Sequence, residues 1–423
     1  MAGDWEDLTL GDLGRVVTGK TPLTAVEGNF GGQIPFVTPS DMDGRKAIST
    51  TARNLTEAGA ASIKGAKIPA GSVMVSCIGS DMGKAVIAGR DCVTNQQINS
   101  IVVDDRFSNE FVYYNLSTRK DEIRHQAAGG SAQPILNKGD FSRLEITLPP
   151  LTEQKAIAHI LGTLDDKIEL NRRMNATLEA MARALFQSWF VDFAPVRAKL
   201  DGRKPAGLDA ATAALFPTHF QESPLGHIPQ GWTAGTVREG FNLTMGQSPP
   251  GETYNEDGNG IPFYQGRTDF GFRFPTRRIY CTAPTRYAKS GDTLVSVRAP
   301  VGDINMADEE CCIGRGVAAV RHKSGAVSFT YHAMENLSPD FALFEGEGTV
   351  FGSINKQNFE NLRFVIPPPE IVAAYEHLAK PLDEQIRTLE HQSRTLATLR
   401  DTLLPQLLSG TLQINNQIGL RHD

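Results

Sequence analysis

The middle of the chain carries a long, narrow stripe of apolar residues. Between Leu151 and Phe193 they recur at alternating steps of three and four, the spacing of one face of an α-helix. The stripe consists of Leu161, Leu164, Ile168, Leu178, Ala182, Leu185 and Trp189. A helix from Thr163 to Phe190 would be about 42 Å long. It is too long and too narrowly striped for an ordinary core helix, so we interpret it as a spacer.

Two asparagines interrupt this stripe. Asn171 and Asn175 occupy the two seam positions between Ile168 and Leu178. A polar residue in such a seam sets register or partner choice at some cost in stability. The pattern therefore favours pairing with a second helix. The alternative is that the helix packs on its own globular domain.

A second striped helix is predicted from Pro381 to about Leu408. Its seam positions are Leu382, Gln385, Leu389, Gln392, Leu396, Leu399 and Leu403. Pro381 corresponds to Thr163 of the first helix, and Lys380 corresponds to Gly162. Because proline and glycine interrupt helices, a break between a short leading helix and a long one is predicted at this place in both. Two stripes diluted by amides are suited to an antiparallel helix pair.

The chain consists of two copies of a module of about half its length. Matching residues are Trp5 and Trp232, Gly19 and Gly246, Gly71 and Gly291, Cys92 and Cys311, and Leu148 and Ile366. Their separation falls steadily from 227 to 218 positions along the chain, as small deletions would produce.

Each copy carries strand-type runs followed by a helix. The predicted strands include Gln33–Thr38, Ser72–Ile78, Ala85–Ala88 and Ser100–Val103, then Gly260–Gln265, Asp292–Val297, Gly302–Met306 and Gly316–Arg321. Helices are predicted at Asn109–Gln126 and Phe329–Leu343. The fold class is α+β: two tandem mixed α/β globules separated by two long antiparallel helices, with a pseudo-twofold internal repeat.

The same pattern gives the predicted domain boundaries. They are module one, 1–150; the first long helix, 151–193; a linker rich in Pro, Gly and Ala, 194–231, with one helical turn near Ala210–Phe216; module two, 232–368; the second long helix, 369–410; and a polar tail, 411–423.

Composition and charge are those of a soluble, cytoplasmic protein. No apolar run reaches membrane-spanning length, and Met1–Leu10 is too acidic and polar for a signal peptide. The five cysteines lack CxxC spacing, which argues against a disulfide frame or a zinc site. The net charge of −6 counts against coating nucleic acid by charge alone, but it allows local basic faces or a DNA grip shared with partners.

One segment imitates a nucleotide-binding motif. Gly14–Thr21 matches GxxxxGK[ST], which binds phosphate only between a buried strand and a helix. Here Pro22 follows the motif, and the second copy has Phe241 and Gln247 in place of Gly14 and Lys20. We interpret the match as a decoy.

No catalytic or metal-binding residue is predicted. Ser248–Gly251 lacks the aromatic residue of an amino-methyltransferase loop, and none of the nine histidines pairs at metal-ligand spacing. A P-loop NTPase, a stand-alone DNA methyltransferase, and a scaffold that binds protein rather than DNA remain alternative functions.

The loops hold an inventory suited to reading DNA. Arg and Gln can contact base edges bidentately, while further basic residues hold phosphates. The predicted DNA-binding residues are Thr38, Ser40, Arg45, Lys46, Gln96, Gln97, Ser131 and Gln133 in module one, and Gln265, Arg267, Thr268, Arg273, Arg277, Arg278, Arg315, Thr349, Ser353 and Lys356 in module two. The copies agree in framework and differ at these loops, as two modules that read different sequences would.

The segment Leu148–Val196 resembles the central conserved region of type I restriction–modification specificity subunits. NQQIN (Asn95–Asn99) and GSINK (Gly352–Lys356) also resemble segments of that family. The resemblance implies two target recognition domains, each reading one half of a split sequence in double-stranded DNA. It also implies that two conserved antiparallel helices separate these domains.

The resemblance further implies a non-catalytic DNA-recognition subunit with no cofactor of its own and no membrane contact. Its helices would dock two methylase (modification) subunits that bring S-adenosylmethionine, and restriction/translocase subunits would bring ATP and Mg²⁺. The predicted subunit-interface residues are Leu164, Ile168, Asn171, Asn175, Leu178, Leu382, Gln385, Leu389, Gln392 and Leu396.

Overall fold

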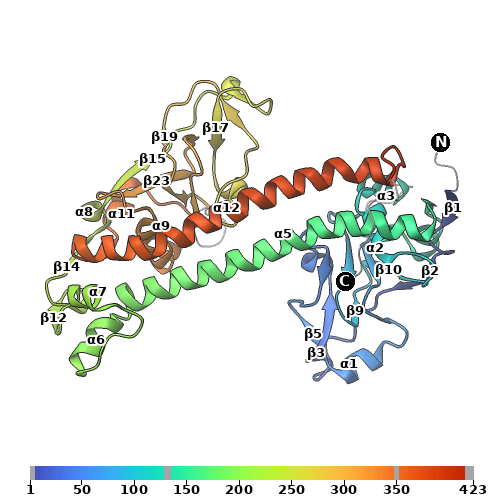
Figure 1. Cartoon of the computed structure of the whole chain (residues 1–423), viewed down its shortest axis with the longest axis horizontal. Helices are drawn as coiled ribbons and strands as arrows, with labels where there is room; N and C mark the ends of the chain where they lie inside the picture. The colour runs from blue at the N-terminus through green and yellow to red at the C-terminus, as the bar shows by residue number, and fades with distance from the viewer. Residues whose placement is uncertain (1–4, 128–134, 347–351, 415–423) are drawn as a thin grey trace. The chain divides into compact units, whose positions relative to one another are not determined.

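The computed structural model describes residues 5–127, 135–346 and 352–414. The chain splits into two compact units: unit 1 comprises Met1–Asn171 and Gln392–Asp423, and unit 2 comprises Arg172–His391. Each unit combines small sheets with short helices and contains a portion of both long helices (Figure 1). The predicted mixture of helix and sheet is confirmed.

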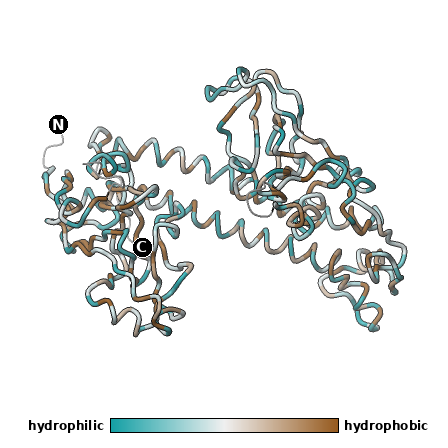
Figure 2. Tube along the Cα trace, turned by 180° about the vertical axis from the view of Figure 1, so that it is seen from behind, coloured by the Kyte–Doolittle hydropathy of each residue, from teal (hydrophilic) through white to brown (hydrophobic). Residues whose placement is uncertain are grey.

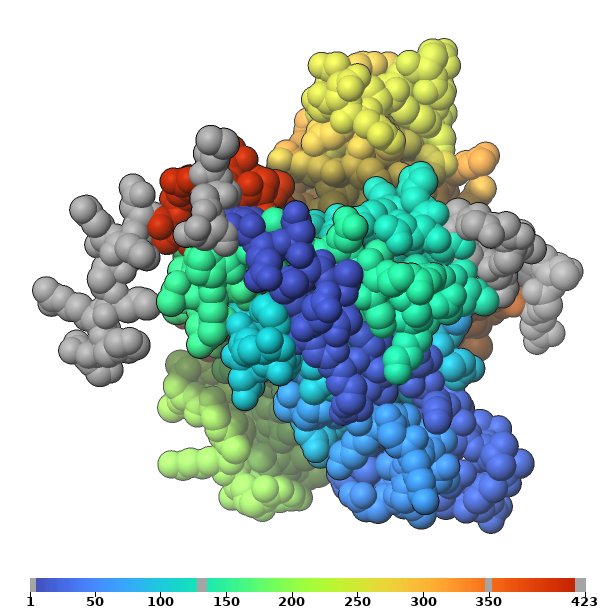
Figure 3. All heavy atoms as spheres, turned by 90° about the vertical axis from the view of Figure 1, so that its right-hand side faces the viewer, coloured from blue at the N-terminus to red at the C-terminus, as the bar shows by residue number. Residues whose placement is uncertain are grey.

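Unit 1 is built on a five-stranded sheet of order β2-β10-β7-β8-β4, beside a four-stranded sheet β5-β3-β9-β6 and the pair β1-β11. The strands are β1 (Glu6–Thr9), β2 (Gly14–Thr18), β3 (Phe30–Val37), β4 (Ala47–Ile48), β5 (Asn54–Leu55), β6 (Lys67–Ile68), β7 (Val73–Ser76), β8 (Ala85–Ala88), β9 (Cys92–Thr94), β10 (Ile98–Val103) and β11 (Glu145–Leu148). In the space-filling view the dark-blue start of the chain lies against the turquoise segment that contains β11, because β1 and β11 pair antiparallel (Figure 3).

Unit 2 repeats this arrangement with a four-stranded sheet β15-β23-β20-β21, a five-stranded sheet β16-β18-β17-β22-β19 and the pair β14-β24. The strands are β14 (Thr233–Thr236), β15 (Phe241–Met245), β16 (Tyr254–Asn255), β17 (Ile261–Tyr264), β18 (Tyr280–Cys281), β19 (Tyr287–Ala288), β20 (Thr293–Val297), β21 (Val301–Met306), β22 (Cys311–Ile313), β23 (Val317–His322) and β24 (Arg363–Ile366). The larger sheet of unit 1 and its counterpart share the order of their first four strands, so the internal repeat is confirmed at the level of topology.

Short helices accompany the strands of each unit. They are η1 (Pro39–Asp41), α1 (Glu57–Ser62), α2 (Asn109–Ser117), α3 (Lys120–Ala127) and α4 (Lys138–Ser142) in unit 1, and α8 (Val237–Gly240), η3 (Gly251–Thr253), η4 (Arg267–Asp269), α9 (Val327–Asn336), α10 (Ser338–Ala342) and α11 (Lys356–Glu360) in unit 2. The single helix predicted at Asn109–Gln126 is two helices, because the chain turns at Thr118 and Arg119 between α2 and α3.

The two long helices are α5 (Leu151–Phe186), extended by a π-helical turn η2 (Gln187–Val191), and α12 (Pro369–Leu408). Hydrophobic and hydrophilic positions alternate along both (Figure 2). Their contacts run antiparallel within each unit, as predicted. In unit 1, Asp165 meets Arg400 and Asn171 meets Gln392; in unit 2, Ala182 meets Tyr375.

The predicted break in both long helices is wrong. Ala379 before Pro381 and Ile386 after it are both buried, and their packing keeps α12 continuous. This packing outweighs the roughly 3 kcal/mol that an interior proline costs. In α5, Gly162 lies inside the helix and leaves room for the Lys46 side chain, because a Cβ there would lie 3.2 Å from Lys46 Nζ.

The segment 194–231 is not the simple linker that its composition predicted. It contains α6 (Ala194–Leu200), the hairpin β12 (Phe220–Ser223) and β13 (Gly226–Pro229), and the predicted turn as α7 (Ala210–Leu215). Val196, Phe216 and Ile228 are buried in the main core of unit 2. Their apolar contacts make this segment part of the unit.

Aromatic residues dominate the core of unit 2. Phe329 lies near the rings of Phe186, Phe190 and Tyr375, with ring centres 5.1–6.2 Å apart. The first two come from α5 and its extension and the last from α12, so the helix pair is part of this core. Within the described residues, every helix is too short or too polar to span a bilayer.

Candidate nucleic-acid interface

Parallel strand pairing brings two of the predicted loops of module one together. β3 runs parallel to β9, with Val37 opposite Thr94, so both strands end at the same edge of the sheet. Thr38 and Gln96 follow directly after these ends. The hydroxyl of Thr21 donates a hydrogen bond to Gln96 Oε1 at 2.6 Å and adds a third segment to the cluster.

Module two builds the same three-loop cluster with different side chains. β17 runs parallel to β22, with Tyr264 opposite Ile313, and Gln265 and Arg315 follow these strand ends. Ser248 Oγ donates to Gln265 Oε1 at 3.1 Å and accepts the main-chain N–H of Arg315 at 3.3 Å. Two predicted loops that lie far apart in the sequence therefore form one cluster.

The sequence reasoning missed Thr21 and Ser248 as members of these clusters. Both stand two residues after the matched glycines Gly19 and Gly246, so the repeat held the signal. A Cβ on Gly19 would collide with the carbonyl oxygen of Asn95, so glycine allows these two loops to lie this close together. The nucleotide-binding pattern at Gly14–Thr21 lacks the strand–loop–helix geometry of a phosphate loop. Its first five residues, Gly14–Thr18, are a strand that pairs antiparallel with β10.

Three arginines lie in the segment between β17 and β18 of module two, and each is paired with an acidic residue. The pairs are Arg267–Asp303 (2.7 Å), Arg277–Glu309 (2.5 Å) and Arg278–Asp269 (2.9 Å). The three arginine side chains are about half exposed, but Asp269 is buried, so only the pairs with Asp303 and Glu309 are surface pairs, which are worth about 0–1 kcal/mol each. A phosphate or a base edge can therefore replace Asp303 or Glu309 at little energetic cost, whereas Arg278 leaves a buried carboxylate behind if it moves away.

Apart from Arg273, the predicted DNA-binding residues fall into three groups. Exposed residues are Ser40, Gln96, Gln265, Arg267, Thr268, Arg277, Arg278, Arg315, Ser353 and Lys356; partly buried residues are Thr38, Arg45, Lys46 and Gln97. Ser131, Gln133 and Thr349 lie outside the described residues. Lys46 is engaged by Glu110 at 2.6 Å. Contact of these side chains with DNA stays a prediction.

Arg273 is a correction. Its side chain is fully buried, and its guanidinium group donates to Asp383 Oδ1 at 2.6 Å and to Glu179. The guanidinium carbon lies 3.8 Å from the ring centre of Tyr331. A group enclosed in this way cannot reach a base edge. The sequence predicted a DNA contact from the residue type, because it does not show which way the side chain points.

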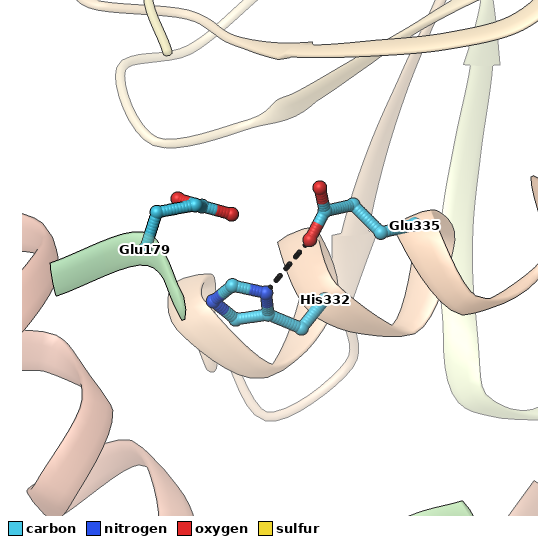
Figure 4. Close-up of side chains that lie close together, drawn as sticks. All are labelled: Glu179, His332 and Glu335. Atoms are coloured by element: carbon cyan, nitrogen blue, oxygen red, sulfur yellow. Dashed lines mark hydrogen bonds and ion pairs between the residues drawn. The ribbon is translucent and has the colours of Figure 1, made fainter. Parts of the chain in front are cut away.

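A cluster beside Arg273 offers metal-ligand atoms but does not fit a metal ion. Ligand atoms of Glu179, His332 and Glu335 lie within 4.8 Å of one another, and His332 Nδ1 is 2.9 Å from Glu335 Oε2 (Figure 4). Arg273 contacts Glu179, and Arg183 lies 2.7 Å from Glu335. Two guanidinium groups already neutralise the carboxylates, and a divalent ion would have to displace them.

Burial and charge act on the protonation of this cluster in opposite directions. Burial raises the pKa of the Glu335 carboxyl, but the hydrogen bond and charge of His332 and the charge of Arg183 outweigh it and lower the pKa below the usual value. Burial raises the pKa of Tyr331 to about 12. Because the pKa of Glu335 is lowered, its carboxylate form predominates at neutral pH, as an ion-pair cluster requires.

The family model described as "Type I restriction modification DNA specificity domain" matches the chain twice, over residues 2–180 and 229–398. The two matches contain modules one and two. The chain belongs to this family.

Individual relatives agree with the type I restriction modification DNA specificity domain family. The chain is similar to the type I restriction enzyme MjaIX specificity subunit of Methanocaldococcus jannaschii, with 26% identity over 97% of this chain and 94% of that protein. The HindI specificity subunit of Haemophilus influenzae is 22% identical over 97% of this chain and 100% of its own length. The crystal structure of a type I S subunit from M. genitalium shares the fold, with a TM-score of 0.57, 16% identity and 96% of each chain covered.

In this specificity-domain chain the polar residues predicted in the seam of the long helices are buried in α5 and exposed in α12. Asn171 and Asn175 are buried, and Asn171 Nδ2 donates to Gln392 Oε1 at 2.9 Å. Gln385 is a correction, because it is exposed while its neighbour Ile386 is fully buried. Gln392 is exposed as well, although it accepts the hydrogen bond from Asn171.

The remaining seam residues differ in burial. Leu164, Ile168, Leu178, Leu382, Leu396 and Leu403 are partly buried, Leu389 is buried, and Leu399 is 46% exposed, contrary to its predicted place in the seam. The predicted stripe followed steps of seven residues, whereas the buried face drifts because an α-helix has about 3.6 residues per turn. Docking of partner subunits on these residues stays a prediction.

Each unit of this specificity-domain chain has a buried carboxylate where its module meets the long helices. In unit 1, Asp165 accepts hydrogen bonds from Tyr114 Oη and Arg400 Nη1, both at 2.6 Å. Burial and the neighbouring Asp165 raise the pKa of Tyr114. Burial lowers the pKa of Arg400, but its hydrogen bonds to Asp165 and Asp401 outweigh this and raise it.

Replacing Asp165 by Ala should lower the free energy of unfolding of unit 1 by about 1–3 kcal/mol, because a buried hydroxyl and a half-buried guanidinium lose their acceptor. Hydrogen exchange of the α2 amides measures this effect. Asp166→Ala is the matched control, since Asp166 is exposed on the next position of α5. Equal exchange rates in the two variants would contradict a structural role for Asp165.

Proposed function

We propose that the chain is the DNA sequence-specificity subunit of a type I restriction–modification complex. Each module reads one half of a bipartite DNA site, and the long helices set the gap between the halves and dock methylase subunits. The chain supplies recognition, and the complex supplies the chemistry.

One observation carries this proposal. The two modules share the order of their sheets and the three-loop cluster at the ends of parallel strands, yet the side chains in the cluster differ. Module one presents Thr38 and Gln96 where module two presents Gln265 and Arg315. Gln and Arg favour adenine and guanine edges respectively, so such clusters are suited to reading two different half-sites.

The partners follow from the family. Relatives named type I restriction enzyme specificity subunits belong to enzymes with further subunits. We propose that two methylase subunits bind S-adenosylmethionine and methylate adenine, and that restriction/translocase subunits bind ATP and Mg²⁺. The net charge of −6 is consistent with a DNA grip that these partners share.

Mapping methylated adenines in cells that carry this chain, and in matched cells that lack it, tests the proposal. We expect one bipartite motif, methylated in both halves, to disappear with the chain. A gel shift with DNA containing that motif, with and without the methylase subunits, distinguishes a DNA reader from a protein-binding scaffold. Binding of nucleotide or S-adenosylmethionine by the purified chain alone would favour the NTPase or methyltransferase alternatives.

Replacing Arg267 by Ala should relax recognition at one position of the half-site that module two reads. If the side chain contacts a base bidentately, the expected loss is about 1–3 kcal/mol for the preferred base and little for the others. Competition binding with every base at each position measures it. Arg238→Ala in α8 is the control, because Arg238 is an exposed arginine outside the loop cluster. An equal loss on all sequences would indicate a phosphate contact.

A further inference from the structure

Arg273 joins module two to both long helices through its side chain. It is fully buried, while the side chains of its two acidic partners, Glu179 of α5 and Asp383 of α12, are only 11% and 9% exposed. Its guanidinium plane also covers Tyr331 of α9. A single cation from the module thus meets one carboxylate from each helix.

The main chain of Arg273 is tied to the sheet of the module. Its carbonyl accepts the N–H of Met306, at the end of β21, at 2.9 Å. The same loop is closed by a hydrogen bond from Thr276 N–H to the Asp269 carbonyl at 2.7 Å, and Asn305 Nδ2 donates to the Gly271 carbonyl at 3.0 Å. Arg267, Arg277 and Arg278 flank this closed loop, so the contact with the helices is transmitted directly to it.

Module one has the same joint but a different electrostatic arrangement. The carbonyl of Lys46 accepts the N–H of Ile87 at 2.8 Å, as that of Arg273 does from Met306, so the two basic residues are equivalent. The Lys46 ammonium group, however, goes to Glu110 of its own module. In unit 1 the cation that meets the helix carboxylate Asp165 is Arg400, which belongs to α12.

The energetics separate orientation from stability. Replacing a buried ion triad by apolar side chains of similar volume is often neutral or stabilising, so the triad is weak evidence for stability. A planar guanidinium with fixed N–H directions, in contrast, accepts its partners in few orientations, whereas apolar contacts are non-directional. What the triad adds over an apolar joint is direction.

We propose that Arg273 is a positioning residue for DNA recognition: its bridge to Glu179 and Asp383 sets the orientation of module two on the long helices, and thereby the half-site gap that the subunit accepts. This inference rests on the proposed function. Module one relies instead on Arg400 within the helix pair, while its equivalent residue Lys46 pairs with Glu110 of its own module.

The test replaces the triad by apolar residues, Arg273→Met with Glu179→Leu and Asp383→Leu, in the complex with methylase subunits. Methylation is measured on DNA with identical half-sites and gaps one base pair shorter, equal and longer than the natural gap. We expect an unchanged unfolding midpoint and unchanged half-site sequences. The preference for the natural gap should fall by about tenfold or more, the scale on which small misplacements change rates.

Two further variants complete the design. Arg273→Lys keeps the charge and should fold. An ammonium group lacks the planar fork of N–H donors that fixes the orientation of both carboxylates, so we expect a gap preference between those of the wild type and the triple variant. Lys380→Met is the control, because Lys380 is an exposed residue of α12 that pairs with Glu384 of its own helix.

The outcomes are distinct. If the triple variant folds and keeps the wild-type gap preference, the positioning role is overturned. If the triple variant does not fold, a wild-type gap preference in Arg273→Lys overturns it instead. A wild-type complex whose methylation ignores one or both half-sites would instead remove the proposed function itself.

Discussion

Replacing Arg273 by Ala is expected to lower the free energy of unfolding of unit 2 by about 3–5 kcal/mol. The substitution leaves Glu179 and Asp383 as buried carboxylates without their cation, and it removes the packing against Tyr331. Urea unfolding followed by tryptophan fluorescence measures the change, because Trp189 and Trp232 are both buried in this unit.

Arg267→Ala is the matched control for stability. Arg267 lies in the same loop region, is 56% exposed and has one surface partner, so its loss should change the unfolding free energy by no more than about 1 kcal/mol. The two variants should therefore separate the roles of neighbouring arginines: Arg273 in the fold and Arg267 in DNA recognition. Similar stabilities would show that the buried triad is not what holds the loop.

Inserting four residues into each long helix is expected to lengthen the accepted gap between half-sites by one or two base pairs. The insertions follow Arg173 in α5 and His391 in α12, so that each lies between the Asn171–Gln392 and Asn175–Glu390 contacts. Four residues add about 6 Å and turn the helix about 40° past a full turn. One base pair adds about 3.4 Å and turns the duplex by about 35°.

Binding to the original site should fall toward the non-specific level, about 10³-fold or more, and recover on DNA with the longer gap. Competition binding across a series of gaps measures both effects. The same four residues inserted after Gly258, in an exposed loop of module two, should leave the preferred gap unchanged. A gap that does not respond to the helix insertions would contradict the spacer role.

Much of the fold was predictable from the sequence because the relevant signals are local or repeated. The strand at Ala85–Ala88 is a short apolar run, and the strand at Gly302–Met306 alternates polar and apolar residues from Asp303 to Met306. Both appear within one residue of their predicted bounds. The paired matches at Gly19 and Gly246 identified the repeat. The buried Asn171 is a seam residue by spacing alone.

Other features depended on which side chains the fold brings together. Ile386 rather than Gln385 faces the buried seam of α12, because the direction of each residue depends on the accumulated helical turn. Pro381 does not end the helix, because packing on both sides outweighs its local effect. The segment 194–231 belongs to unit 2 because a few apolar residues in a polar stretch are buried in its core.

The candidate interface shows the same division. Gln96 and Gln265 were recognisable as residues suited to base edges, but their grouping with Thr21 and Ser248 follows from parallel pairing between strands distant in sequence. Arg267 and Arg273 stand in one basic and aromatic stretch, and only the fold shows that the first is exposed and the second buried.

By itself, the sequence determined that this protein has two related modules and two long striped helices, because periodicity and repetition are properties of the linear chain. The tertiary structure alone decided which arginine is available to DNA and which is enclosed between helix carboxylates. Burial and ion pairing depend on groups from α5, α9 and α12 that meet only after folding, and no spacing within one segment specifies them.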